Sequence, residues 1–189
     1  MSLQSLQQFS LVGGTALSLR YGHRSSEDLD LFFHEQFDHS IIENELMQEF
    51  KDEFSYESGH RNFGIFCYLQ NIKVDIVYFP HLPIEIKTEE NIRFYSDADI
   101  SAMKIQAILG RAKKKDFWDL YELLQHYSLQ QMIDWHQQKY PSQMLAISIP
   151  NAITYFTDAD ESKTPESFKN QTWEGIKKSI QKTVRDYLR

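Results

Sequence analysis

Cysteine is almost absent from this sequence, since only one of the 189 residues, Cys67, is a cysteine. A disulfide needs two cysteines, so none can form within the chain, as is typical of proteins in a reducing compartment. Cys67 lies in the apolar stretch 65–69, which has the pattern of a strand. We therefore expect Cys67 to be a small, buried apolar side chain.

Long apolar runs and an excess of positive charge are also missing. No stretch is long enough to span a membrane, and residues 1–8 have neither the basic start nor the apolar centre of a signal peptide. We therefore expect a cytoplasmic protein without a membrane partner. The formal net charge of −7 argues against a generally basic surface for nucleic acid, although bound metal ions would make an acidic site locally more positive.

Glycine is scarce as well, with seven residues, so two adjacent glycines near the start of the chain stand out. The surrounding residues read as a short strand, a two-glycine turn, a helix and a second strand. Gly13 and Gly14, followed by Thr15, would let main-chain N–H groups approach a phosphate at the start of that helix. Asp28 and Asp30 come two residues apart on the second strand, so both carboxylates point to one face and indicate a magnesium site.

Two other Asp-x-Asp pairs occur, so spacing alone does not identify a metal site. Asp97 and Asp99 follow Ser96 just before a helical pattern, where a serine N-cap and an acid at the third helical position are expected. Asp158 and Asp160 lie in a loop-like run. Only the first pair lies on an apolar strand pattern after a glycine turn, where carboxylates without a ligand would be unfavourable.

Hydrophobic spacing predicts a helix-covered sheet in the first half of the chain. Residues 39–50 carry apolar side chains at helical spacing, so this helix is expected to cover one face of the sheet. From residue 53 the period changes to two, which predicts an antiparallel meander with a turn at Gln70-Asn71. Pro80 and Pro83 are expected to end the sheet.

Asp75 stands alone among the apolar residues of the last strand of this meander. An unpaired buried carboxylate costs on the order of several kcal/mol. A metal ion bound together with Asp28 and Asp30 would remove that cost. The alternative is an edge-strand aspartate that faces water or pairs with Lys73.

From residue 97 onward the pattern is helical. Lys104 and Arg111, seven residues apart, share a face of the first helix, and Asp116 and Asp119, three apart, share a face of the next. Ion pairing between the two helices is the alternative to a functional role for Arg111. For Lys104 we expect phosphate binding, because its stem lies between apolar neighbours while its ammonium projects toward the sheet.

The run Lys113-Lys114-Lys115 is the dense basic cluster near this site. A run of charges is usually a solvated surface, and the alternative is a local attraction for a polyanionic acceptor such as tRNA. Beyond residue 129, apolar spacing predicts three further helices around residues 132–135, 144–147 and 176–188.

Two stretches resemble conserved blocks of a known family. The first block is Gly13-Gly14-Thr15-Ala16-Leu17 with His23-Arg24-x-Ser26-x-Asp28-Leu29-Asp30-Leu31-Phe32, and it is similar to the first motif of the AbiE-type (AbiEii) abortive-infection toxins. The run from Met103-Lys104 through Arg111 and Lys115-Asp116 to Asp119-Leu120 resembles the second block of the same family. These toxins are nucleotidyltransferase-like proteins of bacterial toxin–antitoxin systems, within the DNA polymerase beta superfamily.

The resemblance and the patterns together predict an α+β fold in two parts. Residues 1–95 would form a mixed or antiparallel nucleotidyltransferase sheet flanked by helices, and residues 96–189 a helical bundle that completes the active site. The superfamily supplies a third metal-binding carboxylate from the strand beside the Asp-x-Asp strand, which implies Asp75. The second block supplies a functional aspartate, for which we favour Asp119 over Asp116.

The expected activity is that of a magnesium-dependent nucleotidyltransferase of enzyme class EC 2.7.7. It would transfer a nucleoside monophosphate from an NTP to an acceptor hydroxyl of RNA or tRNA, with a cognate antitoxin as a further partner. Two Mg²⁺ ions, or Mn²⁺ in their place, would activate the acceptor hydroxyl and stabilise the leaving pyrophosphate. The metal ligands would be Asp28, Asp30 and Asp75, and the phosphate-binding residues Gly13, Gly14, Thr15, Arg24, Ser26, Lys104 and Arg111.

Two alternatives to this activity remain open. One is transfer to a small-molecule or protein acceptor by the same fold. The other is a catalytically silent module that binds a nucleotide or a partner.

Overall fold

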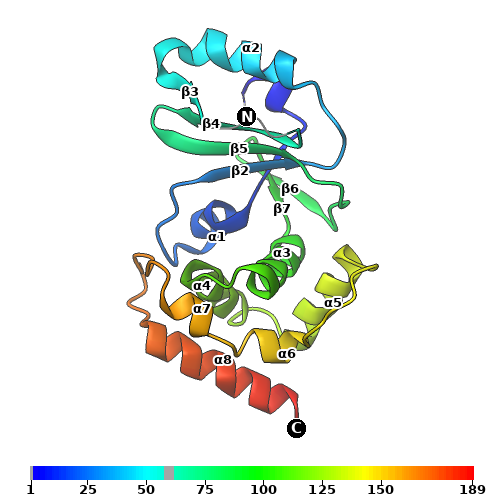
Figure 1. The fold of residues 1–189 in the computed structure, drawn as a ribbon, viewed down its shortest axis with the longest axis vertical. Helices are drawn as coiled ribbons and strands as arrows, with labels where there is room; N and C mark the ends of the chain where they lie inside the picture. Colours follow the sequence, from blue (N-terminus) through cyan, green and yellow to red (C-terminus); the bar gives the residue numbers. More distant parts are fainter. Residues whose placement is uncertain (1, 58–61) are drawn as a thin grey trace.

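A seven-stranded mixed sheet occupies one end of the molecule and a group of helices the other (Figure 1). The structure is a computed structural model that describes residues 2–57 and 62–189. The strand order across the sheet is β3-β4-β5-β2-β1-β7-β6. The strands are β1 (Ser10–Val12), β2 (Leu29–Phe33), β3 (Phe54–Tyr56), β4 (Gly64–Leu69), β5 (Ile72–Tyr78), β6 (Ile86–Glu89) and β7 (Ile92–Tyr95).

The helices divide between the two faces of the sheet and the lower part of the molecule. One face is covered by α2, whereas α1 and α3 lie on the opposite side, with the later helices below them (Figure 1). Among the described helices, none is long and apolar enough to cross a membrane. The helices are α1 (Gly13–Tyr21), α2 (His39–Phe50), α3 (Asp97–Gly110), α4 (Lys114–Leu123), α5 (Leu129–Lys139), α6 (Ile149–Ala152), α7 (Thr157–Asp160) and α8 (Trp173–Tyr187).

The two faces of the sheet differ in chemistry because side chains alternate along each strand. Strands β2 and β5 run parallel, with Leu31 beside Ile76 and Asp30 beside Asp75. Leu31 and Ile76 are buried in the hydrophobic core together with Leu46 of α2. Asp30 and Asp75 therefore lie on the opposite face, the side of the sheet on which α1 packs.

Several local predictions are confirmed. The helix predicted over residues 39–50 is α2, with the same bounds. The predicted antiparallel meander is formed by β3, β4 and β5. Gln70 and Asn71 both have positive φ, as a tight hairpin turn requires. Cys67 is fully buried. Ser96 caps α3 by accepting a hydrogen bond from the main-chain N–H of Asp99, which agrees with the predicted capping role.

The expectation that Pro80 and Pro83 end the sheet is wrong. The β6–β7 hairpin follows them, and Leu11 of β1 pairs in parallel with Phe94 of β7. Strand β6 is an edge strand whose side chains at residues 87–89 are exposed, so it lacks the alternating apolar pattern. Strand β6 pairs with its hairpin neighbour β7, and the hairpin joins the sheet because β7 pairs with the distant strand β1.

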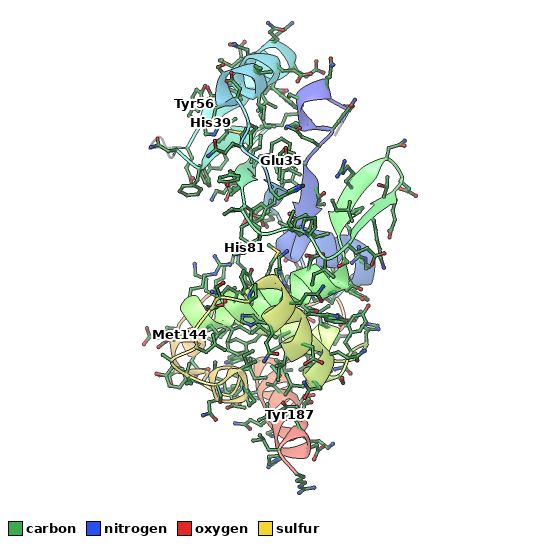
Figure 2. All side chains as sticks on the ribbon, turned by 90° about the vertical axis from the view of Figure 1, so that its right-hand side faces the viewer. Glu35, His39, Tyr56, His81, Met144 and Tyr187 are labelled. Carbon is green, nitrogen blue, oxygen red and sulfur yellow. The ribbon has the colours of Figure 1, made fainter. Side chains whose placement is uncertain are left out.

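The helix predicted around residues 144–147 is also wrong. This segment lies between α5 and α6 without helical structure, and Met144 is 96% exposed at the periphery of the helical part (Figure 2). The apolar side chains here face water, so their spacing does not reflect packing. A smaller correction applies to Asp158 and Asp160, which lie in the one-turn helix α7 rather than in a loop.

Candidate active site

Asp30 and Asp75 are the centre of the predicted site, because they are direct neighbours on two parallel strands in the middle of the sheet. Asp28 lies one residue before β2 rather than on the strand. Gly13, the first residue of α1, approaches this pair so closely that a Cβ there would lie 2.7 Å from Asp30 Oδ2. With φ at +73°, Gly13 also adopts a conformation that side chains disfavour.

The electrostatics of this pair favour a bound cation. Burial, together with repulsion from Asp75 and Asp28, raises the pKa of Asp30 above its usual value. Burial also raises the pKa of Asp75, although Lys73 partly offsets it. Asp75 Oδ1 is buried and accepts no hydrogen bond from any described residue.

The alternative for Asp75, an edge-strand position with pairing to Lys73, is correct only for the pairing. Asp75 lies on an inner strand of the sheet rather than on an edge, but Lys73 Nζ does lie 3.4 Å from Asp75 Oδ2. The same ammonium lies 3.4 Å from Glu57 Oε1, so Asp75 shares its lysine with a second acid. One oxygen of Asp75 is thus paired, and the other is not.

Oxygen donors, negative charge and the unpaired Oδ1 are what a hard divalent cation requires. The ligand set is not closed, however. No three His, Cys, Asp or Glu side chains within residues 2–57 and 62–189 are arranged to hold one ion. Lys115 Nζ lies 3.6 Å from Asp28 Oδ2, so a lysine ammonium lies beside this predicted metal ligand.

Gly14 makes room for the guanidinium of Arg24. A Cβ at Gly14 would lie 2.1 Å from Arg24 Nη2 and 3.2 Å from Ser26 Oγ. The glycine pair therefore admits the side chains of Asp30 and Arg24 to the start of α1, in addition to any role in phosphate approach. Arg24 itself is buried, with its Nε and Nη2 donating to the two carboxylate oxygens of Asp119 at 2.7 and 2.8 Å.

Asp119 is the most highly connected acid of the site. Besides Arg24, it contacts His23 Nε2 at 2.7 Å and Lys104 Nζ at 2.6 Å. Burial alone would raise the pKa of Asp119, but Lys104, His23 and Arg24 outweigh it and hold that pKa far below its usual value. The carboxylate is therefore ionised and joins the loop after α1 to α3 and α4.

Lys104 is buried and pairs with both acids of α4, since its Nζ lies 3.0 Å from Asp116 Oδ1 as well as beside Asp119. Burial disfavours its charge, but the two acids outweigh this and raise the pKa of Lys104. Its charge also offsets part of the rise in the pKa of Asp30, so it acts on the carboxylate pair. Arg111 forms the interhelical pair that was the alternative to a functional role, with Nε 3.4 Å from Asp116 Oδ2.

Thr15 and Ser26 fix the loop that leads into β2. Thr15 Oγ1 contacts Ser26 Oγ at 2.9 Å and the main-chain carbonyl of Asp28. The Thr15 hydroxyl is thus engaged within the protein, whereas Ser26 is half-buried and lines a cavity. The two hydroxyls position Asp28 relative to the start of α1.

A cavity of about 770 Å³, here called the lysine-lined cavity, adjoins these residues. Its volume lies within the range of small-molecule sites. Lys114 points elsewhere and binds the main-chain carbonyls of Asp160 and Ser162, so the lysine run is divided between the cavity and a structural contact. The lining includes Arg24, Ser26, Asp28, Lys113, Lys115 and Lys163.

The wall formed by residues 162–166 is the part of the site that the sequence did not indicate. The chain there is tied to the loop before β2, because Ser25 N donates to the Glu166 carbonyl at 2.9 Å and Phe168 N to the His23 carbonyl at 3.1 Å. No local motif marks this segment, since its role arises from pairing with residues far away in the chain. His23 was visible in the motif, but its contact with Asp119 was not.

A family model and a relative match almost the whole chain in sequence. A sequence model of the AbiEii family, described as "Nucleotidyl transferase AbiEii toxin, Type IV TA system", matches residues 3–186. An uncharacterized protein of Aquifex aeolicus (strain VF5) is 32% identical over 195 residues, covering 100% of this chain and 92% of the relative.

Solved structures share the fold. The nucleotidyltransferase toxin MenT4 (Rv2826c) of Mycobacterium tuberculosis H37Rv matches with a TM-score of 0.57 at 14% identity, over 95% of this chain and 76% of the toxin. JHP933 of Helicobacter pylori matches with a TM-score of 0.50 at 16% identity, over 97% of this chain and 90% of that protein. The match over residues 3–186 decides the family: this chain belongs to the AbiEii nucleotidyl transferase toxins of type IV toxin–antitoxin systems.

Proposed function

We propose that the protein is a magnesium-dependent nucleotidyltransferase that transfers a nucleoside monophosphate from an NTP to a hydroxyl group of RNA, with tRNA as the foremost acceptor. The observation that carries this proposal is the register of Asp30 beside Asp75, next to the glycine-led start of α1 and the lysine-lined cavity. Because the protein has a net charge of −7, it would attract a polyanion through a local basic surface rather than through its overall charge.

Asp28, Asp30 and Asp75 would hold the divalent ions. The unpaired, buried Oδ1 of Asp75 and the raised pKa values of Asp30 and Asp75 support this assignment. Magnesium, or manganese in its place, supplies charge neutralisation on the triphosphate and a lower pKa for the acceptor hydroxyl. The chain's own contribution is to keep two carboxylates side by side on rigid neighbouring strands.

The donor triphosphate would enter the lysine-lined cavity. Lys113, Lys115 and Lys163 line that cavity and supply positive charge, while Ser26 supplies a hydroxyl donor. The guanidinium of Arg24 lies against Gly14 at the start of α1, where main-chain N–H groups and the helix dipole also favour a phosphate. These groups would orient the phosphates toward Asp28 and Asp30.

Asp119 would act as a positioning residue rather than as a ligand of the substrate. It is fully buried and holds Arg24 and Lys104 by direct contacts. Lys104 would place a positive charge behind the carboxylate pair, and Asp116 would share in holding it. Arg111, whose exposed side chain pairs with the buried Asp116, would contribute charge to the phosphate-binding side.

The chain would work as two parts, residues 1–95 carrying the carboxylates and residues 96–189 carrying the helices that complete the site. The buried pair between Arg24 and Asp119 would join the two parts. Its setting would be the bacterial cytoplasm, where NTP and RNA are both present, beside the antitoxin that the family name implies.

The proposal is tested by incubating the purified protein with Mg²⁺, total bacterial RNA and each α-³²P-labelled NTP in turn. We expect label in tRNA-sized bands with one nucleotide. Asp30→Asn should abolish the label, and Asp158→Asn, which changes an exposed acid outside the site, should leave it unchanged. Label on metabolites or on protein instead of RNA would identify another acceptor, and nucleotide binding without transfer would indicate a silent module.

A further inference from the structure

The sheet face that carries Asp30 and Asp75 continues into an aromatic surface. Phe32 follows Asp30 by two residues and Phe79 follows Asp75 by four, so they lie on the same face at about 7 and 13 Å along the strands. The main-chain N–H of Phe79 donates to the Phe33 carbonyl at 2.8 Å, so the strand geometry extends this far. The Phe32 and Phe79 ring centroids are 5.1 Å apart.

Phe79 in turn lines a second cavity of about 550 Å³, here called the aromatic cavity. Its other walls are His81, Gln106, Tyr140 and residues 141–143. The ring of His81 lies 4.8 Å from both the Phe79 and the Tyr140 ring centroids. Figure 2 places His81 at the junction between the sheet and the helices.

The polar groups of this cavity suit the edge of a base rather than a phosphate. His136 Nε2 lies 3.0 Å from Gln106 Oε1, and no contact within the described chain engages Gln106 Nε2. The ammonium of Lys139 lies 5.6 Å from the Phe79 centroid but is bound to Asp99 at 2.6 Å. Flat rings with a free amide donor are what stacking and hydrogen bonding of a nucleobase require.

The order of features along β2 and the residue before it indicates which substrate each cavity binds. Asp28 lines the lysine-lined cavity, Asp30 stands beside Asp75, and Phe32 leads to Phe79 of the aromatic cavity. A transfer between two substrates needs one on each side of the reacting carboxylates. The basic side suits the triphosphate, which leaves the aromatic side for the acceptor.

We propose that the aromatic cavity binds a base of the acceptor RNA, close to the nucleotide whose hydroxyl reacts. This proposal rests on the proposed function for the identity of the acceptor. Stacking on Phe79 and His81 would hold the end of the strand with little regard to sequence, because every base offers an aromatic face. Gln106 would add a hydrogen bond to the edge of the base.

The test measures binding without chemistry. A short fluorescent single-stranded RNA with a 3′-deoxy end is titrated with protein, in Mg²⁺ and without NTP, and anisotropy is recorded. Phe79→Ala and His81→Ala should each weaken binding about tenfold. The ring-preserving variants Phe79→Tyr and His81→Phe should retain it. Tyr155→Ala, which removes a half-exposed aromatic ring outside both cavities, should bind like the wild type.

Three outcomes separate this proposal from the proposed function. If the protein labels RNA but Phe79→Ala and His81→Ala bind and label it normally, the aromatic cavity is not the acceptor site, although the transfer stands. If these variants lose affinity for NTP instead, the cavity binds the donor base, and the proposal is overturned. If RNA binding falls as expected but no labelling occurs with any NTP, the base site stands without the transfer.

Discussion

The guanidinium of Arg24 and the carboxylate of Asp119 form a two-pronged, buried ion pair, with Nε–Oδ1 at 2.7 Å and Nη2–Oδ2 at 2.8 Å. The two residues are 95 positions apart, one in the loop after α1 and the other in α4. Parallel N–H···O bonds fix both the distance and the plane of the guanidinium. The pair therefore holds Arg24 against Gly14 and connects the sheet to the helices.

Replacement of this acid should destabilise the protein. Asp119→Asn leaves the buried Arg24 without a full negative partner and leaves Lys104 with Asp116 alone, which we expect to lower the free energy of unfolding by about 3 kcal/mol. Urea unfolding followed by circular dichroism measures the change. Asp158→Asn, at an exposed position, is the control and should unfold like the wild type.

The stability of the folded protein should also depend on pH through Asp119. Because the folded-state pKa of Asp119 is lowered, its stabilisation is fully present above the unfolded pKa, near 4, and is lost as the pH falls toward the folded pKa. Wild type should therefore lose stability below about pH 4 more steeply than Asp119→Asn. Parallel acid-unfolding curves for the two proteins would contradict the assigned role of the carboxylate.

Divalent metal should stabilise the protein through the carboxylate pair. Mg²⁺ or Mn²⁺ added to metal-free protein should raise the thermal midpoint of the wild type, and EDTA should reverse the shift. Asp30→Asn should show no such shift. In metal-free buffer this variant should be as stable as the wild type or slightly more so at pH 7, because the raised pKa of Asp30 means that its ionised form costs folding energy there.

An equal metal response in wild type and Asp30→Asn would place the ion elsewhere. A variant that is much less stable than the wild type in metal-free buffer would show that the carboxylate supports the fold by itself. The first result would remove Asp30 from the proposed metal site.

A methyl group at Gly14 should displace Arg24. Its Cβ would lie 2.1 Å from Arg24 Nη2, and Asp119 prevents the guanidinium from moving aside easily. We expect Gly14→Ala to cost about 1–3 kcal/mol of stability and to weaken NTP binding at least tenfold. Calorimetric titration with a non-hydrolysable NTP measures the affinity.

Gly110→Ala is the matched control. A Cβ at Gly110, the last residue of α3, meets no atom within 4 Å, and alanine favours helix. This variant should bind NTP normally and be as stable as the wild type or slightly more so. Equal losses in both variants would mean that the effect of Gly14→Ala does not come from Arg24.

Cys67 should be unreactive in the folded protein. Burial, followed by the nearby Asp75 charge, raises the pKa of the thiol to about 12. At pH 8 a disulfide reagent such as DTNB should therefore modify it only after unfolding, since the thiolate is the reactive form. Addition of denaturant provides the positive control, and stoichiometric modification of the native protein within seconds would contradict the buried placement.

Local features of the fold were readable from the sequence because they depend on neighbouring residues. The spacing of apolar residues fixed the bounds of α2, and the residues at 70–71 marked the turn between β4 and β5. The motif around Gly13 and Gly14 indicated the approximate start of α1, although the glycines are the first residues of that helix rather than a turn before it. The serine cap of α3 follows from its own side chain.

The errors have a common physical origin. The β6–β7 hairpin was missed because the edge strand β6 exposes polar residues and because the hairpin gains its position when β7 pairs with β1. The segment around Met144 carries apolar residues that face water, so their helical spacing does not come from packing against the rest of the protein. In both places the surroundings, not the local pattern, determine the structure.

The sequence by itself determined the family, the identity of the charged residues and their order along the chain. Only the tertiary structure decided their relationships: Asp30 beside Asp75, Arg24 held by Asp119, and residues 162–166 closing the lysine-lined cavity. Such contacts join segments far apart in the chain. They form only when the sheet and helices pack. Burial of the apolar core supplies the free energy of that packing and thereby fixes where these charged side chains meet.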